Sequence, residues 1–190
     1  MSPPTNDSFT PPATQEAVVA DSSGKAILWS EAPCPPFRSD QLYIRTDAVA
    51  INPSDTKMMG EFITPFGIFG ADYAGTVIAV GSAVKNTNVN VNVKVGDRVC
   101  GAQHSMFATR PDHGAFGQYN VSNGAVWLKL PPSMSTEAGA SLGAGISTAG
   151  LAMRALGLPL PDAPTKSPTR VLVYGGSTAT GTIAIQLLKL

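Results

Sequence analysis

VLVYGGSTATGTIAIQLLKL, residues 171–190, is the stretch of sequence that decides the fold. Its apolar beginning, Val171 to Tyr174, predicts a buried strand, and the glycines that follow predict a tight turn that opens a helix. The glycines are Gly175, Gly176 and Gly181, and the apolar stripe of the helix is Ile183, Leu187 and Leu188. A strand, a glycine-rich turn and a helix in this order are what a dinucleotide-binding α/β unit requires.

The turn offers backbone N–H groups and the positive end of a helix dipole, which together suit a pyrophosphate group. Hydroxyl groups at Ser177, Thr178 and Thr180 can add donors. We therefore predict the start of a Rossmann domain with phosphate binding at Gly175 to Thr180, and the alternative is a merely tight turn. The residue that distinguishes NAD from NADP falls about 20 positions further on, beyond Leu190.

Upstream, from Glu16 to Lys129, short alternating stretches lie between Gly, Pro, Asn and Asp residues, which is the pattern of an all-β unit. In one of them, Leu42, Ile44 and Ala48 are expected to share one strand face. The pattern predicts a small closed barrel. Its strands are expected within QLYIRTDAVAIN (41–52), GTVIAV (75–80), DRVCG (97–101) and GQYNVS (117–122).

An Asn-Val unit repeats from Asn88 to Val93, between two of these strands. Loops absorb added length at small entropic cost, so we interpret the repeat as an inert loop expansion. The alternative is that its alternating pattern extends an edge strand.

After the strands, the hydrophobic period changes to that of helices. Ser135 predicts an N-cap, with Glu137 in the first turn, where a carboxylate complements the helix dipole. A second helix is predicted from about Ser147 to Leu156. Gly157 is expected to end it, with Pro159 just beyond.

These signals divide the chain into three segments. Residues 1–14 are predicted to be a disordered tail, and residues 15–168 a mainly β domain with short helices and a linker at its end. Residues 169–190 are predicted to be the incomplete start of a Rossmann α/β domain. A lone parallel strand with one helix has no neighbour to pair with, so we expect this last segment not to form a sheet by itself.

Thirteen Lys and Arg residues balance thirteen Asp and Glu residues, which argues against nucleic acid or an anionic membrane surface as a partner. Residues 1–14 lack the features of a signal or transit peptide, and no apolar run reaches the roughly 18 residues of a membrane span. We therefore expect a cytoplasmic protein and take it to be a monomer. Cys34 and Cys100 lie far apart and suit reduced thiols, and a disulfide is the unsupported alternative.

No metal site is predicted. The chain has neither converging Cys, His and carboxylate ligands nor four closely spaced cysteines. His104 and His113 are not at ligand spacing from a cysteine, and we expect both to be surface residues. Asp72, within GADYAG, is expected to order a turn.

Six motifs carry a resemblance to a known family: AVAINPSDTKM, FGADYAGTVIAVGS, VGDRVCGA, GAFGQYNV, GISTAGLAM and VLVYGGSTATGT. Over almost the whole chain they resemble the zinc-free, quinone-oxidoreductase-like branch of the medium-chain dehydrogenase/reductase family. Within that branch, INPSDTK, GISTAGLAM followed by LGLPLP, and VYGGSTATGT look most like the trans-acting enoyl reductases of fungal polyketide synthases, of the lovastatin type.

The resemblance implies a GroES-like catalytic barrel, a Rossmann domain and NADPH as the hydride donor. It also implies reduction of the α,β double bond of an acyl chain, held on the acyl carrier protein of a polyketide synthase or hybrid synthase, in fungal secondary metabolism. By motif match, the cofactor would contact Ser54, Asp55, Thr56, Lys57, Ser177, Thr178, Ala179 and Thr180. The acyl cleft would be lined by Ala149, Gly150, Leu151, Ala152, Met153, Arg154, Ala155 and Leu156. Thr148, at the head of that helix, would lie near the nicotinamide.

Enoyl reduction needs particular chemical groups. Hydride addition to the β-carbon of an enoyl thioester places negative charge on the thioester oxygen, which needs a donor, and the α-carbon then needs a proton. Lys57 and Thr148 are the candidate catalytic residues for that environment. The alternative is that Lys57 is a solvated loop lysine and Thr148 a helix cap.

Family members continue through the rest of the Rossmann sheet, whereas this chain ends inside the first helix. We therefore expect a truncated member with an unfinished cofactor site, and tight NADPH binding by the 190-residue chain would contradict this expectation. Two other classes stay open. One is an inactive remnant or non-catalytic module that binds a synthase. The other is a reductase of small quinones or enones, against which GISTAGLAM argues.

Overall fold

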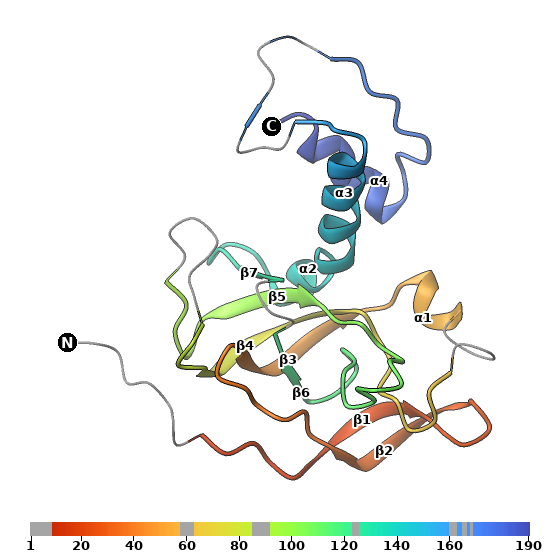
Figure 1. Ribbon diagram of the computed structural model, residues 1–190, viewed down its shortest axis with the longest axis vertical. Helices are drawn as coiled ribbons and strands as arrows, with labels where there is room; N and C mark the ends of the chain where they lie inside the picture. Colours follow the sequence, from red (N-terminus) through yellow and green to blue (C-terminus); the bar gives the residue numbers. More distant parts are fainter. Residues whose placement is uncertain are drawn as a thin grey trace.

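The computed structural model describes residues 9–57, 63–84, 92–122, 126–159, 163–164, 167 and 169–190. Strands form the lower body of the molecule in Figure 1, and a long helix rises from it with a second helix at its side. In chain order the elements are β1 Thr14–Ala20, β2 Ala26–Pro33, β3 Leu42–Ala50, α1 Pro53–Lys57, β4 Asp72–Val80, β5 Arg98–Ala102, β6 Tyr119–Val121, β7 Trp127–Lys129, α2 Thr136–Ala140, α3 Gly143–Ala155 and α4 Ala179–Leu187. Within the described ranges, no helix is long and apolar enough to cross a membrane.

The larger sheet has five antiparallel strands in the order β6-β3-β4-β5-β7. Its central strands approach closely at Gly75 of β4. A Cβ on this residue would stand 2.1 Å from the carbonyl oxygen of Arg45 on β3, so only glycine fits there. Alternate residues of these strands point into one core, as the period of two requires. The buried core cluster is Leu42, Ile44, Tyr73, Val77, Val99, Ala115 and Trp127.

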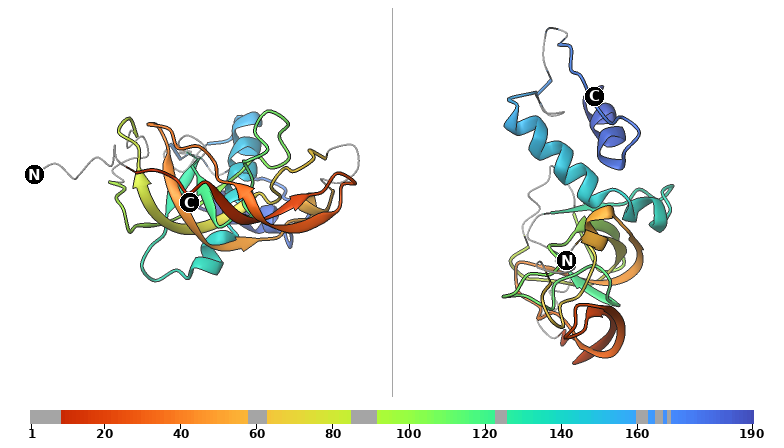
Figure 2. Two further views of the ribbon diagram at one scale, coloured as in Figure 1. Left: turned by 90° about the horizontal axis from the view of Figure 1, so that it is seen from below. Right: turned by 90° about the vertical axis from the view of Figure 1, so that its right-hand side faces the viewer.

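β1 and β2 form a separate two-stranded antiparallel sheet. Single bridges join β1 to the rest of the body, Ala17 with Gly117 and Val19 with Ile68. Next to the first bridge, the side-chain oxygen of Gln15 accepts a hydrogen bond from the Tyr119 N–H at 2.7 Å, in place of a ladder bond. The predicted barrel is therefore formed by two sheets that are linked by bridges. The β1-β2 hairpin runs along one side of it (Figure 2).

The four predicted strand stretches correspond to β3, β4, β5 and β6. The sequence patterns did not predict β1, β2, β7 or α1. Ala48 was expected to share a strand face with Leu42 and Ile44, and it does not. Because the pairing shifts register between Thr46 and Ala48, Ala48 packs with Ala74 and Cys100 instead. Residues 88–91, most of the Asn-Val repeat, lie outside the described residues.

Residues 9–14 are not the disordered tail that was predicted. The Phe9 ring packs against Phe37 and Tyr43, with ring centroids 5.7 and 5.0 Å apart. The carbonyl oxygen of Ala13 accepts a hydrogen bond from the Cys34 N–H at 3.2 Å, and β1 begins at Thr14. Burial of an aromatic ring offsets the entropy lost when a short segment is ordered, which accounts for the difference. Residues 1–8 lie outside the described part of the chain.

Both predicted helix signals of the 130–159 region are found. The Ser135 hydroxyl accepts a hydrogen bond from the Ala138 N–H at 3.1 Å, which confirms Ser135 as the N-cap of α2. At the end of α3, Gly157 has a φ of 64° and its N–H donates to the Arg154 carbonyl at 3.1 Å. The Leu158 N–H donates to the Met153 carbonyl at 2.9 Å, which completes a Schellman motif.

The predicted strand Val171 to Tyr174 is not observed. This segment is irregular, and Leu172 and Tyr174 are 92% and 100% exposed. A strand needs a neighbour for its N–H and C=O groups, and the described residues place none beside it. α4 does form and packs against α3, where a Cβ on Gly145 would stand 2.4 Å from Cδ1 of Ile183. Residues 169–190 are therefore held by contact between helices and not by a sheet.

Candidate active site

The turn after β3 exposes three of the predicted cofactor residues, Ser54, Thr56 and Lys57. They lie on α1, which begins at Pro53, and proline suits the first position of a helix because its missing N–H has no partner there. The Thr56 hydroxyl donates a hydrogen bond to the Pro53 carbonyl at 2.9 Å. Lys57 is the last residue of α1, so its cation extends from an exposed helix end.

Asp55 differs from its neighbours because it is buried. Its Oδ2 accepts a hydrogen bond from the Asn52 N–H at 2.7 Å, and its own N–H donates to the Asn52 carbonyl at 3.0 Å. Burial raises the pKa of the Asp55 carboxyl, and hydrogen bonds from the N–H groups of Asn52 and Ala71 oppose that rise. The carboxylate therefore holds the turn together, and its contact with a cofactor stays a prediction.

Asp72 was expected to order a turn, and the residues that it bonds are not its neighbours in the sequence. It begins β4, it is 2% exposed, and its partners lie 20 and 72 residues away. Oδ2 accepts a hydrogen bond from Nδ2 of Asn52 at 2.7 Å, and Oδ1 accepts one from the Ala144 N–H at 2.5 Å. Burial raises the pKa of the Asp72 carboxyl, these two bonds oppose the rise, and the nearby Asp55 adds to it.

Thr148 lies in the second turn of α3 and is exposed. Thr148 was predicted to lie at the head of the helix, but α3 already begins at Gly143. The alternative of a helix cap is wrong for the same reason. The catalytic role of Thr148 stays a prediction.

The predicted acyl-cleft residues, Ala149 to Leu156, are distributed around α3. Ala149 and Met153 are buried, whereas Leu151 and Leu156 are among the exposed large apolar side chains. Side chains on opposite faces of a helix cannot line one surface. The structure therefore divides the predicted set, and substrate contact stays a prediction for its members.

The glycine-rich turn is formed as a tight turn. Gly175 has a φ of 82°, a conformation that favours glycine. The Thr178 hydroxyl donates to the Gly175 carbonyl at 2.8 Å and accepts from the Gly181 N–H at 3.1 Å, so Thr178 is the N-cap of α4. The N–H groups of Ala179 and Thr180 belong to the first turn of α4, where a helix offers them no internal partner. Such N–H groups can hold an anion.

The two predicted sets of cofactor residues thus come from separate elements, α1 and the start of α4. Figure 1 shows both elements to the right of α3. Ser177, Thr178 and Ala179 are exposed and Thr180 is half-buried. That the two sets bind one cofactor stays a prediction.

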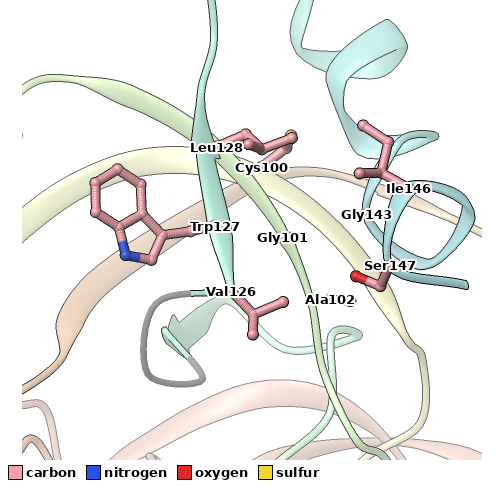
Figure 3. A pocket seen from close by; sticks show the side chains of 9 residues that line it. All are labelled: Cys100, Gly101, Ala102, Val126, Trp127, Leu128, Gly143, Ile146 and Ser147. Atoms are coloured by element: carbon pink, nitrogen blue, oxygen red, sulfur yellow. The ribbon is translucent and has the colours of Figure 1, made fainter. Parts of the chain in front are cut away.

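A cavity of about 110 Å³ lies at the foot of α3, between this helix and strands β5 and β7 (Figure 3). It is lined by Cys100, Gly101, Ala102, Val126, Trp127, Leu128, Gly143, Ile146 and Ser147. The side chain of Ser147 points toward β5. The sequence prediction missed this cavity, although GAG at 143–145 carries its signal. A Cβ on Gly143 would stand 2.2 Å from the Gly101 carbonyl oxygen, so glycine lets the helix meet the strand.

One of the two histidines departs from the expected surface position. The side chain of His113 is 12% exposed, contacts the Arg110 guanidinium and lies 3.9 Å from Asp112. Burial lowers the pKa of His113, the Arg110 cation lowers it further, and Asp112 opposes both effects. His113 is half-buried because the loop folds back, with the His113 N–H donating to the Arg110 carbonyl at 3.0 Å.

His104 is exposed and packs edge-on against Phe107, with ring centroids 5.1 Å apart. Across the part of the chain that the structure describes, no three His, Cys, Asp or Glu side chains are grouped so that they could hold a metal ion.

Comparison with known proteins identifies the family. Residues 38–132, which include β3 to β7, match the alcohol dehydrogenase GroES-like domain. The chain therefore belongs to the medium-chain dehydrogenase/reductase family.

Two similar relatives are fungal. The chain is 54% identical over 188 residues to the enoyl reductase component lovC of the lovastatin nonaketide synthase from Aspergillus terreus, covering 96% of this chain and 50% of that protein. It is also 54% identical over 188 residues to the dehydrogenase mokE from Monascus pilosus, covering 96% of this chain and 51% of that protein. The chain thus spans about half the length of these curated relatives.

Solved structures share the fold. The quinone oxidoreductase from Coxiella burnetii superposes with a TM-score of 0.63 at 25% identity, over 93% of this chain and 52% of that chain. The crystal structure of the CurK enoyl reductase gives a TM-score of 0.64 at 19% identity, over 93% of this chain and 51% of that chain.

Proposed function

We propose that the protein is an NADPH-dependent enoyl reductase that acts in trans on an acyl chain carried by a polyketide synthase or hybrid synthase. The observation that supports this most strongly is the 54% identity to an enoyl reductase component of such a synthase. That identity covers 96% of this chain, so it includes both the α1 turn and the glycine-rich turn. Residues 15–168 then act as the GroES-like catalytic domain, and residues 169–190 begin the Rossmann domain.

The glycine-rich turn has a form that suits a dinucleotide. A Cβ on Gly181 would stand 2.2 Å from the Gly175 carbonyl oxygen, so the turn closes tightly over the start of α4. The N–H groups of Ala179 and Thr180, with the positive end of the helix dipole, would hold the pyrophosphate. The Thr178 hydroxyl is already used in the cap, so Ser177 and Thr180 are the hydroxyl groups that remain to donate.

NADPH, when bound, supplies the hydride for the β-carbon of the substrate. Of this chain's own residues, Lys57 carries the exposed cation of α1, which stabilises negative charge on a phosphate or on the thioester oxygen. The Thr148 hydroxyl is exposed on α3 and can donate a hydrogen bond to the same oxygen. The charge on the thioester oxygen develops during the reaction, which is where a donor accelerates it.

The partner that we propose is the acyl carrier protein of the synthase, and the proposed location is the cytoplasm. Thirteen basic and thirteen acidic residues leave no net charge for attraction to nucleic acid or to an anionic membrane. We take the reductase to act as a monomer.

The test compares two forms of the protein with two substrates. The purified 190-residue chain, and the same chain fused to the second half of the 54%-identical relative, receive NADPH with either a carrier-bound enoyl chain or a small quinone. We expect the fusion to oxidise NADPH with the carrier-bound substrate. Activity on the quinone alone would overturn the proposal in favour of a small-molecule reductase. Co-purification with a synthase without NADPH oxidation would instead favour a non-catalytic binding module.

A further inference from the structure

Asp72 is bonded to both segments that carry the proposed catalytic residues, the α1 turn with Lys57 and α3 with Thr148. We propose that Asp72 is a positioning residue, whose buried carboxylate holds α1 and α3 in one arrangement so that Lys57 and Thr148 serve the same site. This inference rests on the function proposed above.

The first connection is to α3. Leu142 occupies the N-cap position of this helix, and its side chain makes no capping hydrogen bond. The cap comes from β4, where Oδ1 of Asp72 accepts from the Ala144 N–H at 2.5 Å. A carboxylate is also the group that the positive end of a helix dipole favours. Asp72 therefore supplies from a distant strand what the local sequence of α3 lacks.

The second connection is to α1. Asn52 precedes this helix, and its backbone N–H and C=O groups are both bonded to Asp55. Its side-chain amide is left to act elsewhere, and Nδ2 donates to Oδ2 of Asp72 at 2.7 Å. The two oxygens of one carboxylate thus hold the beginnings of two helices.

Both hydrogen bonds of Asp72 lie within a few residues of the proposed catalytic residues. Thr148 follows Ala144 by four residues, about 6 Å along the helix axis. Gly143 lets the head of α3 meet the sheet, because a Cβ there would stand 2.8 Å from Oδ1 of Asp72. Lys57 ends the short helix that begins beside Asn52. A change at Asp72 would therefore move both proposed catalytic residues.

Asp97 provides a matched control. It is 9% exposed and, like Asp72, accepts one backbone and one side-chain hydrogen bond, from the Lys94 N–H at 2.9 Å and from Nζ of Lys129 at 2.8 Å. A buried carboxylate with a purely structural role should behave alike at the two positions. Asp72→Asn and Asp97→Asn therefore separate positioning from general stability.

The first readout is amide hydrogen exchange in the 190-residue chain. In Asp72→Asn, the introduced side-chain amide can accept from Ala144 only by turning its NH₂ group toward the Asn52 donor. We expect exchange to accelerate about tenfold or more both at Ala144 and at Asn52 and Asp55, relative to a strand amide such as Val18, whose N–H donates to the Phe116 carbonyl at 2.8 Å. Asp97→Asn should leave these sites unchanged. Acceleration at Ala144 without acceleration in α1 would overturn the proposal.

A swapped pair provides a rescue. When Asp72→Asn is combined with Asn52→Asp, the introduced amide oxygen can accept from Ala144 while its NH₂ group donates to the introduced carboxylate. The total charge equals that of the original pair. In this double variant we expect the exchange rates at both helix starts to return to within about twofold of those of the original chain. Asn52→Asp alone adds a carboxylate beside Asp55 and Asp72, so its exchange rates there should stay above those of the original chain. Failure of the pair to restore either helix start would contradict the proposed connection.

The second readout is the turnover of the fusion protein. A misplacement of about 1 Å can cost up to about 100-fold in rate, so we expect Asp72→Asn to lower kcat at least tenfold and Asp97→Asn to change it less than about twofold. Equal kcat in the two variants would overturn a positioning role. If the unsubstituted fusion reduces no carrier-bound chain, the proposed function fails, and the exchange data still decide whether Asp72 couples the two helices.

Discussion

Gly181 lies directly against the carbonyl group of Gly175, so that a Cβ on Gly181 would stand 2.2 Å from that oxygen. The group that such a Cβ would meet is a backbone carbonyl, which cannot move aside as a flexible side chain can. Thr178 joins the same two residues through its hydroxyl, at 2.8 Å to the Gly175 carbonyl and 3.1 Å to the Gly181 N–H. The turn and the first turn of α4 therefore form one unit.

Gly181→Ala should open this turn. The added methyl group must push the Gly175 carbonyl away, which breaks the Thr178 cap and turns the first N–H groups of α4 away from a bound phosphate. We expect the fusion protein to lose NADPH affinity by about tenfold or more, since a lost cap and misaligned donors together are worth more than about 1.4 kcal/mol. Titration calorimetry measures the change.

Gln186→Ala is the control for this prediction. Gln186 is exposed on the same helix, and its side-chain amide donates to the Thr182 carbonyl at 3.2 Å, one turn earlier. Its removal should leave NADPH affinity within about twofold, as for most exposed substitutions. Equal affinity in Gly181→Ala and Gln186→Ala would show that the turn does not bind the cofactor.

Features that depend on neighbouring residues could be predicted from the sequence. The Ser135 cap, the Gly157 helix end and the turn at Gly175 each arise from hydrogen bonds between residues a few positions apart. The short strands β3 to β6 follow in the same way from alternation and turn residues. Such signals are complete within a short stretch of chain, so a single sequence contains them.

Features that depend on distant residues could not be predicted. The start of α3 depends on Asp72, which lies 72 residues before Ala144. Val171 to Tyr174 have the composition of a buried strand, yet strand formation requires partners that composition does not supply. Phe9 is ordered because Phe37 and Tyr43, 28 and 34 residues further along the chain, receive its ring. In each case a contact made elsewhere in the fold decides the outcome.

Ser135→Ala should destabilise the β body. The hydroxyl caps α2 through the Ala138 N–H at 3.1 Å, and α2 packs against β3, β4 and β5. Loss of such a cap costs about 0.5–2 kcal/mol, so we expect the free energy of unfolding in urea to fall by about 1 kcal/mol. Ser135→Asp, which keeps an acceptor at the cap, should retain most of the stability. Equal losses in the two variants would assign the effect to something other than capping.

His113 should make stability depend on pH. Its pKa lies below the ordinary value of 6.5 because burial and the Arg110 cation disfavour the charged ring. Below pH 6.5 the unfolded chain therefore binds a proton that the folded chain does not. The sign follows directly: this contribution to stability is full above pH 6.5 and is lost as the pH falls toward the folded pKa.

His113→Gln removes this titration while keeping a polar side chain of similar reach. We expect the free energy of unfolding of the original protein to decrease more steeply than that of the variant as the pH falls below 6.5, since only the original takes up a proton at this position on unfolding. Urea denaturation at several pH values gives the two slopes. Parallel curves would mean that His113 titrates alike in the folded and unfolded chain.

Thr148→Val should separate the chemistry of Thr148 from its place in α3. The substitution keeps the shape of the side chain and removes the hydroxyl, and Thr148 is exposed, so stability should change by less than about 0.5 kcal/mol. If the hydroxyl donates to the developing negative charge, kcat of the fusion protein should fall by about 100-fold with little change in NADPH affinity. Thr148→Ser keeps the donor and should retain most of the rate. Because only Thr148→Ser keeps the hydroxyl, equal rates in the two variants would remove Thr148 from the catalytic residues and leave Lys57 as the remaining candidate.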